Sequence, residues 1–120
     1  MTKKELYVVR HGKTMFNAIQ RVQGWCDTPL TVEGTQRIHA LGRGLRDHDF
    51  VAAYSSDSGR AIETTRIILS ELENGPKIPY HLDKRIREWC FGSLEGGYDA
   101  EMWGVIPRVL DFASYDEMIA

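Results

Sequence analysis

Short apolar stretches alternate along this chain with longer segments whose apolar residues recur at helical spacing, and this order limits the possible fold most. The predicted strands are residues 6–9, 50–54 and 78–82, and the predicted longer helices follow Thr31 and Ser58. Strands that alternate with helices of about 12 residues or more favour parallel pairing in an α/β layer fold. We therefore expect one α/β domain over residues 1–120.

The predicted elements have recognisable boundaries. Thr14 and Thr31 are candidate N-caps, since a threonine hydroxyl can accept a hydrogen bond from the first turn of a helix. The sequence Asn74-Gly75-Pro76 is typical of a helix end. Residues 6–9 are all apolar, which is typical of a strand buried on both faces. Pro79 places the third strand near a sheet edge.

Composition and charge exclude several functional classes. The 120 residues are 42% hydrophobic and 27% charged, which is ordinary globular composition. The net charge of -2 gives no basic surface for nucleic acid, and no apolar run suits a membrane span or a signal segment. Cys26 and Cys90 form no metal or disulfide motif, so we expect a reduced, cytoplasmic protein. A disulfide between them is the alternative.

Two polar clusters follow predicted strands and are expected at one sheet edge, where parallel α/β sheets bind ligands. In the first, His11 could act as a nucleophile or base, and Arg10 could bind a phosphate through two hydrogen bonds. In the second, Arg60 follows Ser58 at a predicted helix N-terminus, which favours anions. Together the clusters predict a phosphate site, although each taken alone also fits a buried histidine or a solvated arginine.

A third candidate is Glu88, which is flanked by Trp89 and Phe91. Burial by these rings would raise the pKa of the carboxyl group and suit it to general acid catalysis. The alternative is an exposed glutamate in a salt bridge with Arg85 or Arg87.

These residues resemble the signature of the histidine phosphatase superfamily, the phosphoglycerate-mutase-like family. The resemblance implies a three-layer phosphoglycerate-mutase-like fold with a mostly parallel sheet, incomplete at its C-terminal side. The matching segments, in the family's order, are residues 10–14 with Asn17, 23–25, 27–31 with Gly34 and Gln36, 54–57, 60–61, 64–65, 87–88 and 91–96.

The resemblance also implies a mechanism. It makes His11 the nucleophile that attacks a phosphomonoester and Glu88 the acid that protonates the leaving oxygen. It implies neither a metal nor a cofactor, because arginines supply the positive charge. The expected substrate is a small phosphorylated metabolite. The remaining site residues implied are Arg10, Arg60 and Asn17 for phosphate and Gln23 and Gly24 for substrate.

Hydrolysis is favoured over phosphoryl transfer. Mutases of this family resemble Glu-Arg-His-Tyr-Gly around the acid, whereas this chain has Glu-Trp-Cys-Phe-Gly at residues 88–92. Mutases also carry a paired arginine further on, and here only Arg108 follows Arg87. Mutase-type transfer and a non-catalytic phosphate-binding or assembly module are the alternatives.

The main departure from the family is the absence of its second active-site histidine. This sequence has no histidine after His81. Family members are nearly twice as long, so we expect a truncated domain: a fragment, a natural short form, or a degenerate module. An apolar strand edge left open favours a homo-oligomer or a complementing chain. One lost donor to the transferring group would lower the rate by about 10²–10³-fold.

Overall fold

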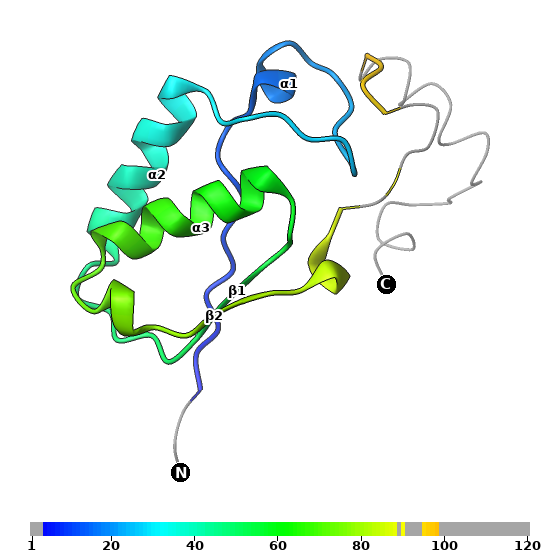
Figure 1. The fold of residues 1–120 in the computed structure, drawn as a ribbon. Helices are drawn as coiled ribbons and strands as arrows, with labels where there is room; N and C mark the ends of the chain where they lie inside the picture. Colours follow the sequence, from blue (N-terminus) through cyan, green and yellow to red (C-terminus); the bar gives the residue numbers. More distant parts are fainter. Residues whose placement is uncertain (1–3, 89, 91–94, 99–120) are drawn as a thin grey trace.

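Two helices packed side by side form the layer that supports the rest of the chain (Figure 1). The computed structural model describes residues 4–88, 90 and 95–98. Helix α2 (Val32–Gly44) contacts α3 (Gly59–Glu71) where a Cβ at Gly42 would come within 2.8 Å of the Glu71 Cβ. The absence of a side chain at Gly42 therefore lets the two helices approach each other closely.

The predicted N-caps are confirmed, whereas the helix that follows Ser58 ends at Glu71, three residues before the predicted end at residues 74–76. Thr14 caps the single turn α1 (Met15–Ala18), and its hydroxyl accepts a hydrogen bond from the Asn17 amide at 3.2 Å. Thr31 caps α2 in the same way, accepting from the Gly34 amide at 2.9 Å. A 3₁₀ turn, η1 (Gly75–Lys77), follows α3 where the sequence predicted a helix end.

A small parallel sheet lies beside the helices. Strand β1 (Ala53–Ser55) pairs with β2 (Tyr80–Leu82), with Tyr54 opposite His81. The predicted parallel pairing is confirmed, although both strands are shorter than the apolar stretches at 50–54 and 78–82. The 3₁₀ turn η2 (Lys84–Ile86) comes two residues after β2.

The strand predicted at residues 6–9 is wrong for this structure. Leu6 and Val8 are 88% and 86% exposed, and the segment has no strand partner among the described residues. The ring of Tyr7 packs edge-on against Phe50, with centroids 5.2 Å apart, and holds the segment beside the chain after α2. The apolar run met the local requirement for a strand, but strand pairing also needs a neighbour within hydrogen-bonding distance, and a cavity separates the segment from β1.

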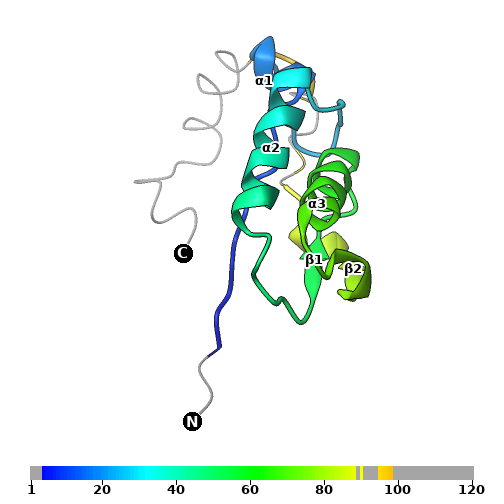
Figure 2. The same ribbon diagram turned by 90° about the vertical axis from the view of Figure 1, so that its left-hand side faces the viewer.

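The buried apolar side chains lie around the helix layer rather than on both faces of the sheet. Figure 2 shows β1 and β2 on one side of α2, with the extended N-terminal segment running along α2. Among the described residues, no helix is long and apolar enough to cross a membrane. The buried apolar side chains are Val22, Leu30, Ile38, Leu72 and Ile78.

Candidate active site

The polar clusters predicted from the strand ends meet at one cavity of about 1120 Å³ between the N-terminal segment, β1 and α3. Arg10 and His11 reach it from the N-terminal side, and Arg60 reaches it from the first turn of α3. Glu88, which follows η2, lines the same cavity. Four of the seven predicted site residues are therefore brought together by segments far apart in the sequence.

His11 is held in one tautomer. Its Nδ1 lies 2.8 Å from the carbonyl oxygen of Gly12. A carbonyl can only accept, so Nδ1 carries the proton and the neutral ring keeps its lone pair on Nε2. Burial lowers the pKa of His11, Arg60 and Arg10 lower it further, and the Gly12 carbonyl and Glu88 oppose the shift. The neutral, nucleophilic form is thus favoured at neutral pH.

The backbone beside His11 is fixed by α3. The Gly12 amide donates to Thr64 Oγ1 at 3.0 Å, and the Thr64 hydroxyl donates to the Arg60 carbonyl at 2.7 Å. A side chain at residue 12 would place its Cβ 2.9 Å from Ile38 Cγ1, so only glycine fits. Thr64 was not singled out from the sequence, because its hydroxyl acts through a contact 52 positions away.

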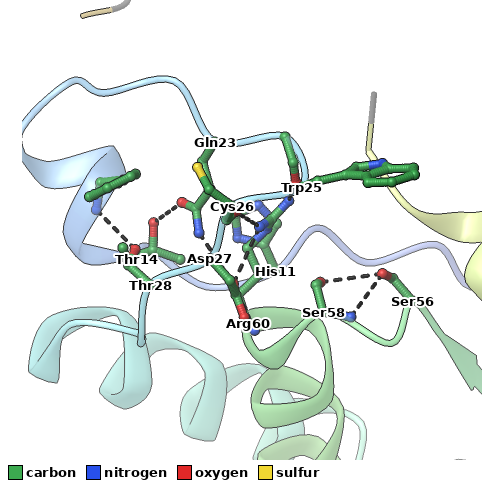
Figure 3. Close-up of polar contacts among 12 residues, drawn as sticks. His11, Thr14, Gln23, Trp25, Cys26, Asp27, Thr28, Ser56, Ser58 and Arg60 are labelled. Carbon is green, nitrogen blue, oxygen red and sulfur yellow. Dashed lines mark hydrogen bonds and ion pairs between the residues drawn. The ribbon is translucent and has the colours of Figure 1, made fainter. Parts of the chain in front are cut away.

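Arg60 is 3% exposed and is held by the loop of residues 23–27. Its Nη2 donates to the Gly24 carbonyl at 2.7 Å, and its Nη1 donates to the Cys26 carbonyl at 2.9 Å. Nη1 also lies 3.3 Å from a carboxylate oxygen of Asp27. Figure 3 shows this guanidinium beside His11 and beneath the loop. The helix start that the sequence indicated thus supplies a buried, oriented cation.

Gln23 and Asn17 support the loops around the site. The amide of Gln23 contacts Thr14 Oγ1 at 2.6 Å, and in its better-satisfied orientation its oxygen lies 3.2 Å from Arg60 Nη1. Asn17 Oδ1 accepts from the Thr14 amide at 3.0 Å and completes a capping box. Neither side chain lines the cavity, and their roles toward phosphate or substrate stay predictions.

Glu88 sits on the exposed side of the cavity. Arg87 donates to both carboxylate oxygens of Asp57 at 2.6 Å, and the Trp25 indole donates to the Glu88 carbonyl at 2.9 Å. These contacts hold the segment after η2 against β1 and the 23–27 loop. Arg85 pairs with Asp83, with 2.6 Å between Arg85 Nη2 and Asp83 Oδ2.

The remaining aromatic residues and the two cysteines have different outcomes. Trp25 is 56% exposed, and the Arg87 guanidinium lies 5.1 Å from its ring centroid. Cys26 and Cys90 are both free thiols, so the alternative of a disulfide between them is wrong. Trp89, Phe91 and Arg108 lie outside the described residues.

A histidine with its Nδ1 held by a backbone carbonyl and two arginines thus surround one cavity of an α/β fold. A comparison of the sequence with models of known families identifies the family. The model of the histidine phosphatase superfamily (branch 1) matches residues 6–117, and the chain belongs to this family.

Known proteins similar to this chain include mutases and phosphatases. It is 36% identical over 91 residues to a probable phosphoglycerate mutase of Yersinia pestis, covering 76% of this chain and 40% of that protein. A phosphoglycerate mutase structure from Bacillus anthracis aligns with a TM-score of 0.77 at 41% identity, covering 91% of this chain and 48% of the other. An α-ribazole phosphatase from Shigella flexneri gives 0.72 at 27%, covering 86% and 49%. The chain thus spans about half the length of these relatives or less.

Proposed function

We propose that this chain carries the nucleophile half of a phosphomonoester hydrolase that works through a phosphohistidine. The observation that carries the proposal is the hydrogen bond between His11 Nδ1 and the Gly12 carbonyl, because it leaves Nε2 as the nucleophilic atom. Arg10 and Arg60 line the same cavity and supply positive charge for the phosphoryl oxygens.

In the first step, Nε2 of His11 attacks phosphorus while the bond from phosphorus to the ester oxygen breaks. Glu88 gives its proton to that oxygen and the alcohol leaves. In the second step, the Glu88 carboxylate takes a proton from water as the water oxygen attacks phosphorus and the P–N bond breaks. Inorganic phosphate, neutral His11 and protonated Glu88 result, so the cycle closes.

The test is hydrolysis of a phosphomonoester by the purified chain in excess chelator, with an alkaline quench to preserve and detect labelled phosphohistidine. We expect the label and the turnover to be lost in His11→Ala. The matched control is His81→Ala, because His81 is exposed on β2 and does not line the cavity. Label that persists in His11→Ala would contradict the proposal.

Mutase-type transfer is the second candidate, because relatives with 36% and 41% identity are named phosphoglycerate mutases. The same assay separates the two with a phosphoglycerate as substrate. Hydrolysis releases inorganic phosphate, whereas transfer produces the isomeric phosphoglycerate.

The expected homo-oligomer or complementing chain, and the cytoplasmic location, stay predictions. The exposed apolar side chains of Leu6, Val8 and Val51 favour a partner that covers this side of the molecule. Light scattering tests the oligomer: a monodisperse monomer that stays folded would count against it.

A further inference from the structure

The carboxylate of Glu95 lies at the far side of the loop that holds Arg60, and none of the roles assigned above involves it. It is half-buried and comes from the segment 95–98, which pairs with the chain around Val22. The Val22 amide donates to the Gly97 carbonyl at 2.7 Å, and the Gly96 amide donates back to the Val22 carbonyl at 3.0 Å. The glutamate is therefore anchored through the backbone of the two residues that follow it.

Successive backbone amides of the 23–27 loop point at this carboxylate. The Gly24 amide donates to Oε2 at 2.9 Å, the Trp25 amide donates to Oε1 at 2.6 Å, and the Cys26 amide lies 3.4 Å from Oε2. The Cys26 thiol also donates to Oε2, at 2.9 Å. Consecutive amides that converge on one anion form a nest that fixes the loop's conformation.

The other ends of these peptide groups hold Arg60. The Gly24 carbonyl and the Trp25 amide belong to one peptide unit, whose oxygen accepts from Arg60 Nη2 at 2.7 Å while its nitrogen donates to Glu95. A single peptide dipole thus lies between a guanidinium and a carboxylate, with its positive end toward the anion and its negative end toward the cation. Charge-assisted bonds at both ends strengthen each other, since each polarises the shared peptide group.

We propose that Glu95 is a positioning residue of the phosphate site: it orients the Gly24–Trp25 peptide and so holds the Arg60 guanidinium at the cavity. The effect of Glu95 on phosphate binding rests on the proposed function, in which Arg60 binds the transferring phosphoryl group. The structural link itself, from Glu95 through the Gly24–Trp25 peptide to Arg60, can be measured without turnover.

The first measurement is side-chain NMR of Arg60 in the full chain, with the signals assigned through Arg60→Lys. Carbonyl acceptors on Nη1 and Nη2 slow rotation of the guanidinium, so the Nη protons give separate signals in the wild type. In Glu95→Gln, which replaces one carboxylate oxygen by an NH₂ group facing amide donors, we expect that rotation to accelerate roughly tenfold. If Glu95→Gln does not fold, Glu95→Asp is read in the same way, with a smaller acceleration.

The matched control is Glu63→Gln. Glu63 is also half-buried and accepts a long-range backbone hydrogen bond, from the Leu30 amide at 3.3 Å, but it does not contact the 23–27 loop in the described contacts. Glu63→Gln should leave the Arg60 signals unchanged. Equal Arg60 signals in the wild type and Glu95→Gln would overturn the inference.

The second measurement is the affinity for inorganic phosphate, determined by titration calorimetry. We expect Glu95→Gln to weaken binding roughly tenfold and Glu63→Gln to leave it within about twofold. In the double variant with Arg60→Lys, the Glu95 change should add little, because both act through one peptide. Full additivity would overturn the positioning role. A wild type that binds no phosphate would contradict the proposed function, while the NMR result would still decide the link from Glu95 to Arg60.

Discussion

The two sides of the cavity differ in how firmly they hold their charged groups. Arg60 is 3% exposed and bonded to two backbone carbonyls, and the Gly12 backbone beside His11 is tied to α3 through Thr64. On the opposite side Arg10 and Glu88 are exposed. Glu88 is positioned there through the Trp25 indole and its neighbour Arg87.

This difference in burial suits two different chemical roles. A group that stabilises charge on phosphorus works best when it is already oriented, because no reorganisation is then needed during the reaction. A group that exchanges protons with a leaving alcohol and then with water needs access to both. The buried side would therefore set the electrostatics, and the exposed side would adapt to the substrate.

The largest expected effect comes from breaking the buried side. Arg60→Gln leaves the Gly24 and Cys26 carbonyls without their charged donor, so we expect a loss of about 3 kcal/mol in the free energy of unfolding and the loss of phosphate binding. Urea unfolding measures the first and calorimetry the second. Arg10→Gln, on the exposed side, should weaken binding with a stability change within about 0.5 kcal/mol. Equal losses of unfolding free energy in both variants would show that the two sides of the cavity do not differ in how firmly they hold their arginines.

The next effect concerns the contact between α3 and the backbone beside His11. Thr64→Val removes the acceptor of the buried Gly12 amide and should cost about 1–3 kcal/mol of unfolding free energy. Thr65→Val is the matched control, since the Thr65 hydroxyl only donates to the Ala61 carbonyl of its own helix, at 2.9 Å. An equal loss of unfolding free energy in Thr65→Val and Thr64→Val would mean that the hydrogen bond from the Gly12 amide adds no stability of its own.

A smaller effect is expected in the titration of His11. Because burial and two arginines lower its pKa, the NMR midpoint should lie below the ordinary value of about 6.5, and Arg10→Gln should raise it. The unfolded chain then takes up the proton first as the pH falls, so this group's contribution to stability is present above pH 6.5 and is lost below it. A midpoint at or above 6.5 in the wild type would contradict the lowering of the His11 pKa by burial and the two arginines.

The smallest effect comes from loosening the exposed side. Arg87→Gln breaks the ion pair with Asp57 and should lower turnover a few-fold, more at low salt than at high salt, with no change in the urea midpoint. Arg85→Gln breaks a similar pair with Asp83, away from the cavity, and should change neither quantity. An identical response of the two variants would show that Arg87 has no part in placing Glu88.

Much of the fold was readable from local patterns, because caps and helix ends are short-range interactions. The predictions of Thr14 and Thr31 as N-caps were confirmed, and α3 ends at Glu71, three residues before the end predicted at residues 74–76. The parallel pairing of β1 and β2 was also confirmed, since it follows from the order of the elements. The strand at residues 6–9 failed because pairing depends on neighbours that the local apolar pattern does not specify.

The family and the candidate residues could be predicted from the sequence, because His11, Arg60 and Glu88 stand in segments whose order and spacing are specific. How Arg60 is held is visible only in the folded chain. Its carbonyl contacts and the link from Glu95 through the Gly24–Trp25 peptide join residues up to 71 positions apart. Such contacts follow from the packing of whole elements, and no local pattern of residues records them.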